Sequence, residues 1–384
     1  MDELTFHVPT TVHFGLDLLN RVGQVASPYG KRAFLTADSV LNEERVVQSI
    51  TGFLKRAGVE SIIFDELGPN STTTSIEKGL ALCRASRSDL VIGVGGIRAL
   101  SCAKCIARLA PIDAPFDDYF SGNHSAEEAN RSLPYIEIPT TCRDPFMLTD
   151  DCVVVDSRNR RSHVYSIGKI ADAAIIDPVL TLSLSDHYTV STMLDTLLSA
   201  IESYFSRRST FLSETLSLRA VGVITSIIDE LAAHSDDRNL RFQASQAGLL
   251  VSLSLTMSTQ GVGTAVAYSI GGKKMVPKST VATVMIPHIL DLGLRSQPKK
   301  VERIGNVLGE EIYGKPLKEF SVRVVDAVRQ RMGLLQVPMR LKELDLELDD
   351  MVEISNIAHE LPAAHFLSEP ISAEDIFALI KQAF

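Results

Sequence analysis

The sequence predicts an α/β domain with an open, mostly parallel sheet in its N-terminal half and an all-α domain in its C-terminal half. Two observations lead to this fold class. In the first half, short β-rich runs alternate with segments of helical spacing, as in a parallel, doubly wound sheet. After Asp177-Pro178 these runs give way to long segments with a period near 3.6 residues. We expect the two domains to cover residues 1–184 and 185–384.

The individual elements follow from the same periods. In the first domain, short apolar runs indicate strands and amphipathic stretches indicate helices. They alternate, beginning with a strand, over residues 33–36, 46–57, 61–64, 74–85, 89–93 and 99–109. The second domain is expected to be mostly helical. Its helices are predicted over residues 190–205, 212–234, 240–257, 279–292, 298–308 and 317–332.

Composition excludes several classes of protein. The chain has 384 residues, of which 45% are hydrophobic, so it is long enough for two or three domains of about 150 residues each. Its 47 acidic and 38 basic side chains give a net charge of −9, which argues against nucleic acid or an anionic membrane as a partner. The five cysteines are few and odd in number, and the first residues lack a basic and then apolar leader, so a cytoplasmic location is expected.

One uncharged stretch, residues 242–272, invites a membrane interpretation. Glutamines, serines and five glycines interrupt it, however, whereas a membrane span keeps about 20 predominantly apolar residues together. We therefore expect this stretch to form helices buried inside a protein domain.

Two loops could hold a nucleotide. The first, Gly93-Val94-Gly95-Gly96-Ile97-Arg98, lies between a predicted strand and a predicted helix. Glycines in such a turn let backbone N–H groups approach a pyrophosphate at the positive end of the helix, although a strand-to-helix turn also needs glycine for steric reasons alone. The second loop, Ile138-Pro139-Thr140-Thr141, follows another apolar strand and carries two hydroxyls. The two loops together favour a nucleotide.

The cysteines and histidines do not form a recognisable metal motif. Cys102 and Cys105 are spaced C-x-x-C but fall inside a predicted helix with no second pair at zinc spacing, so we expect them to be small buried hydrophobes. The nine histidines contain no H-E-x-x-H. His359 and His365 come nearest to a cluster, and their spacing of six places them on different faces of a helix.

The order of several short segments resembles the iron-containing (group III) alcohol dehydrogenases. These segments are Phe14-Gly15, Thr36-Ala37-Asp38, Gly68-Pro69-Asn70, residues 93–104, Ile138-Pro139-Thr140-Thr141, Ile176-Asp177-Pro178, Leu194-Asp195, Glu202-Ser203-Tyr204, Gly271-Gly272 and Pro277. The likeness spans essentially the whole chain. It implies a dehydroquinate synthase-like fold, in which a Rossmann-like nucleotide-binding domain precedes a helical domain, with NAD(P) and a divalent metal in the cleft between them.

The resemblance assigns cofactor roles to the first domain. Asp38 stands where the family's acidic residue approaches the adenosine ribose, and a carboxylate there would repel the extra phosphate of NADP, so NAD is preferred. Gly95 and Gly96 match the first two glycines of the family's Gly-Gly-Gly-Ser loop. Ile97 and Arg98 replace the third glycine and the serine, which crowds the loop but adds a cation for a phosphate.

Two more positions complete the expected cofactor site. Thr140 and Thr141 match the threonine pair that begins the family's second loop, whose glycines are replaced in this chain. Arg161 stands where the family usually has a lysine that contacts the ribose. We expect weak binding of NAD.

The metal site implied by the resemblance has changed. Asp195 aligns with the family's carboxylate ligand, but Ser199, Thr264 and Lys278 stand where the family has three histidine ligands, and Tyr268 replaces a nearby non-ligand histidine. A divalent transition ion needs three or four nitrogen or oxygen ligands. We therefore expect neither iron nor zinc at this position.

Three functions remain open. The first is an NAD-linked oxidoreductase that acts on a small alcohol, aldehyde or ketone, with Lys278 polarising the carbonyl oxygen beside Asp195 and Tyr268 transferring a proton. The second is a lyase or cyclase acting on an anionic compound attracted to Arg98, Arg143 and Lys278. The third is a catalytically silent relative that binds a ligand. A pairing of Lys278 with Asp195 could also be purely structural. The expected partner is a small-molecule substrate, and a homodimer is considered.

Overall fold

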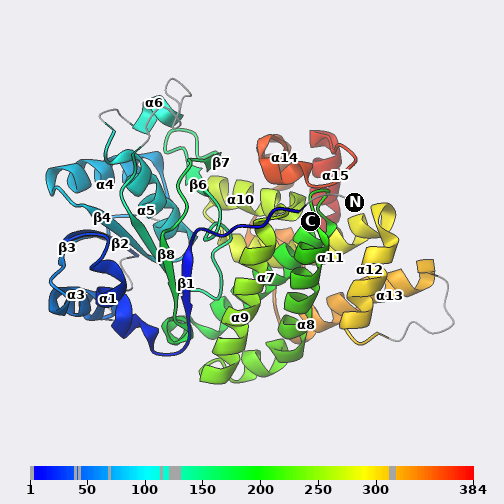
Figure 1. Ribbon diagram of the computed structural model, residues 1–384. Helices are drawn as coiled ribbons and strands as arrows, with labels where there is room; N and C mark the ends of the chain where they lie inside the picture. The colour runs from blue at the N-terminus through cyan, green and yellow to red at the C-terminus, as the bar shows by residue number, and fades with distance from the viewer. Residues whose placement is uncertain are drawn as a thin grey trace. The chain divides into compact units, whose positions relative to one another are not determined.

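The computed structural model of the protein describes residues 4–38, 41, 45–67, 71–112, 116–120, 131–310 and 317–384 (Figure 1). Residues 68–70, which contribute to the family resemblance, lie outside the described residues. The chain divides into two compact units. One comprises Phe6–Ser183, and the other comprises Leu184–Phe384 together with Leu4 and Thr5.

The first unit is built on a six-stranded parallel sheet, which confirms the predicted class of this half. The strands, in spatial order, are β1 (Thr11–Phe14), β8 (Ala173–Ile176), β5 (Tyr135–Pro139), β4 (Leu90–Gly95), β2 (Arg32–Ala37) and β3 (Glu60–Phe64). The central strands are buried on both faces, as parallel strands covered by helices are, and therefore read as continuous apolar runs in the sequence.

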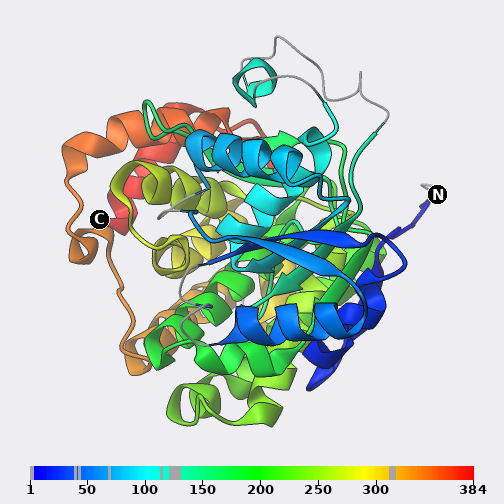
Figure 2. The ribbon, with the colours of Figure 1, turned by 90° about the vertical axis from the view of Figure 1, so that its left-hand side faces the viewer.

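Helices cover both faces of this sheet (Figures 1 and 2). On one face lie α4 (Thr73–Ala85), α5 (Ile97–Leu109) and the short α6 (Phe116–Phe120). On the other lie α1 (Val22–Ala26) and α3 (Val46–Arg56). Each face has its own apolar core, and alternate residues of one strand serve the two: Phe34 packs in the first core and Leu35 in the second. Because the strands are parallel, their carboxyl ends share one edge, which is where ligands bind in such sheets.

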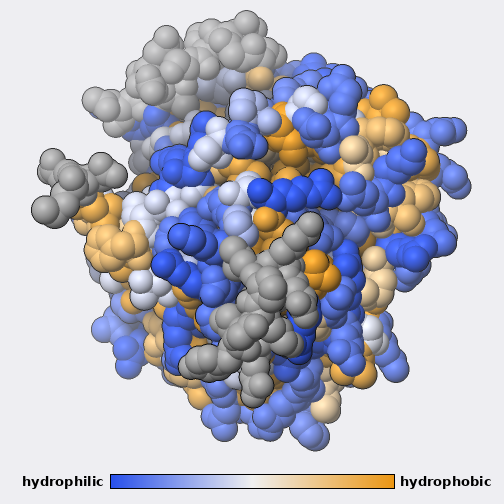
Figure 3. All heavy atoms as spheres, turned by 90° about the vertical axis from the view of Figure 1, so that its right-hand side faces the viewer, coloured by the Kyte–Doolittle hydropathy of each residue, from blue (hydrophilic) through white to orange (hydrophobic). Residues whose placement is uncertain are grey.

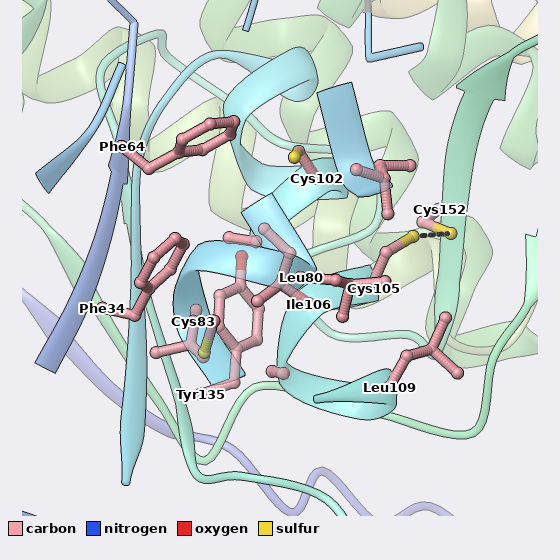
Figure 4. Close-up of a cluster of buried hydrophobic side chains, with 14 of the residues drawn as sticks. Phe34, Phe64, Leu80, Cys83, Cys102, Cys105, Ile106, Leu109, Tyr135 and Cys152 are labelled. Carbon is pink, nitrogen blue, oxygen red and sulfur yellow. Dashed lines mark hydrogen bonds between the residues drawn. The ribbon is translucent and has the colours of Figure 1, made fainter. Parts of the chain in front are cut away.

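The core under α4 and α5 contains the cysteines of the C-x-x-C pair (Figure 4). Cys102 and Cys105 are fully buried in α5, which confirms their expected role as small hydrophobes. The Sγ of Cys105 lies 3.4 Å from that of Cys152 on β6 (Asp151–Val155). Burial raises the pKa of the nearby Cys83 thiol to about 12. Thiols in this environment are protonated and poor nucleophiles.

An antiparallel hairpin made of β6 and β7 (Ser162–Ser166), which was not predicted from the sequence, follows β5 along the chain. A buried lysine anchors the segment that enters it. Lys104 on α5 donates hydrogen bonds to the carbonyl oxygens of Phe146, Thr149 and Asp151 at 2.5, 3.0 and 3.0 Å. The ammonium group satisfies carbonyls that the irregular segment leaves without partners.

The second unit is all-helical over its described residues, as predicted. Its α-helices are α7 (Asp186–Phe205), α8 (Phe211–Ala233), α9 (Arg238–Leu255), α10 (Val262–Lys274), α11 (Lys278–Ser296), α12 (Pro298–Val307), α13 (Leu317–Leu334), α14 (Met351–Glu360) and α15 (Ala373–Ala383). Side-chain caps define several starts: Thr210 and Ser213 form a capping box at α8, and Asp237 caps α9. The bounds of α10 were not predicted, although it lies in the uncharged stretch expected to form helices, and α14 and α15 were not predicted at all.

Two long apolar segments of this unit pack inside it. The uncharged stretch forms most of α9 and most of α10. Every residue from Val262 to Gly272 is buried, which confirms the expectation of buried helices. Among the described residues, α8 alone is long and apolar enough to cross a membrane, but half of its apolar window is buried and α7 and α9 pack against it. On the face drawn in Figure 3, hydrophilic residues predominate and apolar ones gather in small groups.

One buried histidine makes the stability of this unit depend on pH. His288 lies in α11, and burial, reinforced by Arg329, lowers the pKa of its imidazole to about 4, against the opposing effect of Asp291. The unfolded chain therefore binds a proton more readily than the folded chain between pH 6.5 and about 4, so stability falls as the pH drops through this window.

We expect the free energy of unfolding to fall by about 2 kcal/mol between pH 7 and pH 5 through His288 alone, and His288→Gln to remove that part of the fall. Urea unfolding at the two pH values measures it. The matched control is His187→Gln at an exposed position of α7. An equal pH dependence in the wild type and His288→Gln would contradict the assignment.

Candidate active site

The turn between β4 and α5 brings four of the predicted cofactor residues together. Gly96 is the N-cap, so α5 begins at Ile97, two residues earlier than predicted. Gly95 has a φ of +140°, and a Cβ there would lie 2.8 Å from Asp38 Oδ2 and 2.9 Å from Ala99 Cβ. Only glycine fits this position. At Gly96, by contrast, an added Cβ would meet nothing closer than 3.8 Å.

An acidic side chain covers the start of α5. Asp38 Oδ2 accepts a long hydrogen bond of 3.4 Å from the backbone N–H of Gly96, and Asp38 Oδ1 lies 3.2 Å from the guanidinium of Arg98. The Asp38 side chain is 15% exposed. A carboxylate is stabilised at a helix N-terminus for the same reason that a phosphate is. Asp38 therefore lies at the N-terminus of α5, the position predicted from the sequence for a pyrophosphate.

The second loop lies next to this turn. The backbone N–H of Thr140 donates to the carbonyl of Gly95 at 3.0 Å, which continues the pairing of β4 with β5. The methyl group of Thr141 faces Gly96, and its hydroxyl donates to the carbonyl oxygen of Arg143 at 2.8 Å. Arg161 is placed in the turn between β6 and β7 rather than in the turn between β4 and α5.

In the helical unit, the three predicted catalytic residues meet. Lys278 Nζ lies 2.5 Å from Asp195 Oδ1, and the two side chains are 15% and 14% exposed. The same ammonium lies 5.0 Å from the centre of the Tyr268 ring, within the range of a cation–π interaction. Asp195 comes from α7, Tyr268 from α10 and Lys278 from the first position of α11.

The local sequence explains why Lys278 reaches this position. Met275 ends α10 in the left-handed conformation with a φ of 60°, and Pro277 precedes the first residue of α11. This tight connection makes the start of α11 follow directly on the end of α10. Lys278 therefore lies against Asp195 and Tyr268 although 83 residues separate it from Asp195.

A buried glutamate, Glu202, which was not predicted as a site residue, organises the opposite end of α10. Glu202 accepts hydrogen bonds from the backbone N–H of Gly261 at 2.8 Å and from the N–H and hydroxyl of Thr264 at 3.0 and 2.6 Å. Burial raises the pKa of the Glu202 carboxyl, while these donors and the charge of Lys278 oppose the rise. The sequence signal that could have found Glu202 is its spacing from Asp195. Seven residues are two helical turns, which place both carboxylates on one face of a helix.

Two polar groups beside these residues remain unpaired. Among the buried side-chain atoms of the described residues, Ser199 Oγ and Gln260 Nε2 have no hydrogen-bond partner. Ser199 lies one helical turn after Asp195 on α7, and the Gln260 Oε1 atom is 3.4 Å from the Tyr268 hydroxyl. In the sequence, Ser199 is marked only by its place at a histidine position of the family, and no pattern marks Gln260.

The pair of histidines near the C-terminus is elsewhere in this unit. The expectation that His359 and His365 lie on different faces of one helix is wrong, because α14 ends at Glu360 and a short 3₁₀ turn begins at Pro362. Their rings are 5.0 Å apart, and His365 Nε2 lies 2.9 Å from the carbonyl oxygen of His359. No group of three metal-binding side chains occurs among the residues that the structure describes.

Comparisons with known proteins agree with this architecture. Residues 9–178 match the family model described as iron-containing alcohol dehydrogenase, and residues 189–384 match the model of the C-terminal part of the Fe-containing alcohol dehydrogenase family. The 1,3-propanediol dehydrogenase of Klebsiella pneumoniae is 25% identical over 98% of each chain, and the NAD-dependent methanol dehydrogenase of Bacillus methanolicus is 22% identical over 98% of this chain and 99% of its own. A crystal structure of 1,3-propanediol oxidoreductase superimposes with a TM-score of 0.92 at 24% identity, covering all of both chains.

Proposed function

Because the chain belongs to the iron-containing alcohol dehydrogenase family, we propose that it is an NAD-linked oxidoreductase that interconverts a small alcohol and its aldehyde or ketone without a catalytic metal. The observation that carries this proposal is the Lys278–Asp195 ion pair on the face of Tyr268. The substrate is a small molecule, and we propose a cytoplasmic location and a homodimer as the sequence suggested.

The residues at the family's metal position do not fit a divalent transition ion. They provide one carboxylate, the hydroxyls of Ser199 and Thr264, and an ammonium. The carboxylate already holds the ammonium at 2.5 Å, and the Thr264 hydroxyl donates to Glu202. Such an ion prefers imidazole, thiolate or several carboxylates, and a cation among its ligands would repel it. We therefore assign no step to a metal.

The ammonium of Lys278 can take over the electrostatic part of the metal's role. It is held by Asp195 in a largely buried position, so it can donate a hydrogen bond to the oxygen of a bound carbonyl and stabilise the negative charge that develops there. The hydroxyl of Tyr268 gives the proton to that oxygen when the carbonyl is reduced, and takes it when the alcohol is oxidised. Bound NAD would supply the hydride for reduction or accept it in oxidation.

The residues of the first unit fit a dinucleotide, except that the negative charge of Asp38 lies where the pyrophosphate would bind. The open space at Gly96 and the N-terminus of α5 suit a pyrophosphate, and Arg98 is close enough to pair with it. The Asp38 carboxylate must first leave the helix N-terminus, where it occupies the same donors. Once displaced toward the ribose, it would repel the extra phosphate of NADP. This competition supports weak, NAD-selective binding.

The same contact supports a second candidate function. Asp38 and Arg98 neutralise one another at the α5 N-terminus, and Ile97 brings a branched side chain to the turn. A chain that no longer binds a dinucleotide would be a non-redox enzyme or a silent ligand-binding relative on the same fold. Measured affinity for NAD separates these candidates from the first.

Replacing Lys278 with methionine removes the cation at nearly constant length. We expect turnover of a small aldehyde with NADH to fall by about 10²–10³, the usual effect of losing a preorganised donor. The control is Lys274→Met, which removes a lysine paired with Asp350 on the same helical unit. If Lys278→Met alters the melting temperature and leaves turnover unchanged, the ion pair is structural.

Metal independence has its own test. We expect turnover of the wild type to survive dialysis against a chelator. If dialysis abolishes turnover and only added iron or zinc restores it, the reaction depends on a metal.

Replacing Ile97 with glycine tests the cofactor site. We expect NAD to bind more tightly because a branched side chain is removed from the turn, and isothermal titration calorimetry measures the change. The control is Ile97→Ala, which removes the branched side chain but keeps a high helix propensity. It separates the effect of less crowding from the effect of a more flexible backbone. Unchanged or weaker binding in both variants would show that the turn does not serve a dinucleotide.

A further inference from the structure

The Lys278–Asp195 pair lies where a buried helix reaches the surface. On α7, every residue from Thr189 to Phe205 is buried except Asp195. The side chains of Asp195 and Lys278 are 14% and 15% exposed, and Met275, at the end of α10, is half exposed. A small molecule can therefore reach the Lys278 nitrogen without displacing the core of the helical unit.

The position of Lys278 in its helix opposes its positive charge. Lys278 is the first residue of α11, and no side chain caps that end. The N-terminus of a helix carries a partial positive charge, which destabilises an ammonium relative to a neutral amine. By contrast, Lys273 and Lys274 lie in the last turn of α10, where the helix dipole stabilises a cation. Lys278 therefore depends on Asp195 for its charge.

Asp195 can also hold the proton that Lys278 must lose before it reacts. An ammonium has no free electron pair, so only the neutral amine attacks a carbonyl carbon. Asp195 Oδ1 lies 2.5 Å from Lys278 Nζ, so a proton can pass directly between them. The transfer turns two charges into a neutral amine and a neutral acid, which burial favours. The pair therefore contains both the nucleophile and its base.

We propose that Lys278 forms a Schiff base with small aldehydes and ketones, and that Asp195 is the base that activates it. This activity goes beyond the proposed oxidoreductase function, because it requires neither NAD nor a hydride. Lysines in partly desolvated sites are the ones that serve as Schiff-base nucleophiles. The two uses of Lys278 compete, because a nitrogen bonded to the carbonyl carbon no longer donates to the carbonyl oxygen.

The step balances within the ion pair and the carbonyl compound. The nitrogen electron pair forms a bond to the carbonyl carbon, the C=O π bond breaks onto the oxygen, and that oxygen takes the proton from Asp195. Asp195 then removes a second proton from the nitrogen and gives it to the same oxygen, while the C=N bond forms and the C–O bond breaks. Two of the three ammonium protons leave with the oxygen as water, and the product is an iminium ion with the original positive charge.

The groups that hold the ammonium also hold the iminium ion. The Asp195 carboxylate is regenerated beside the nitrogen and is its counter-ion. The centre of the Tyr268 ring lies 5.0 Å from Lys278 Nζ, and an aromatic face attracts an iminium as it attracts an ammonium. The product is therefore stabilised without any rearrangement of the pair.

Borohydride trapping tests the proposal, because borohydride reduces an iminium ion to a stable secondary amine. The protein without NAD is mixed with an equimolar amount of propanal, treated with borohydride and digested, and its peptides are identified by mass spectrometry. We expect a propyl group on Lys278, added at least about tenfold faster than on Lys274. Lys274 is the internal control, because it also pairs with a carboxylate but lies at a helix C-terminus.

Two variants locate the chemistry. Lys278→Arg keeps a cation for Asp195, but its guanidinium stays charged and forms no Schiff base, so we expect the chain to lose its fast-labelled site. Asp195→Asn keeps the size of the side chain and removes the base. We expect labelling of Lys278 to fall at least about tenfold, while that of Lys274 stays unchanged. Melting temperatures show whether each variant is folded.

The result is independent of the oxidoreductase function, since the assay contains no NAD. If Lys278 is labelled no faster than Lys274, the Schiff base is wrong, whatever the turnover with NADH. Unchanged or faster labelling of Lys278 in Asp195→Asn would overturn the role of Asp195 as the base. Selective labelling of Lys278 in a protein that reduces no aldehyde would support the Schiff base and contradict the redox function.

Discussion

The candidate site of the helical unit depends on the buried carboxylate of Glu202. It joins α7 to the N-terminus of α10 through three hydrogen bonds from Gly261 and Thr264. Hydrogen bonds to a charged acceptor contribute about 1.5–3 kcal/mol each, and the helix dipole adds to them. Burial nevertheless raises the pKa of Glu202, so the cost of removing the charge from water outweighs these donors. These hydrogen bonds fix the N-terminus of α10. They therefore position Gln260, just before the helix, and Tyr268, about two turns into it.

Much of the fold could be predicted because its elements carry local signals. Strands buried on both faces give continuous apolar runs, and α3 has a one-sided pattern of buried Val47, Ile50 and Leu54. By contrast, α10 is buried on every side, so it has no apolar stripe and its period is hidden. The early start of α5 depends on the extended backbone of Gly96, and the contact of His359 with His365 depends on the break before Pro362. Neither follows from apolar spacing.

The candidate site could be predicted only in part, and the reason is distance along the chain. The residues at the family's metal position were found through resemblance, which carries three-dimensional information that spacing lacks. Gln260 and Ser199 could not be found in this way, because what singles them out is the absence of a partner in a buried environment. That property depends on every neighbouring side chain. The Asp38–Arg98 pair was likewise out of reach, since two residues 60 apart meet only when β2 and β4 pair.

Each unit holds a carboxylate that is paired with a basic residue of the chain itself. In the first unit Arg98 pairs with Asp38 at the N-terminus of α5, and in the second Lys278 pairs with Asp195. An internal partner has a high effective concentration, so an external ion must displace it before it can bind. This competition opposes a free divalent cation at Asp195 more than it opposes a dinucleotide at α5, because the Lys278 pair is shorter and more deeply buried than the Arg98 pair.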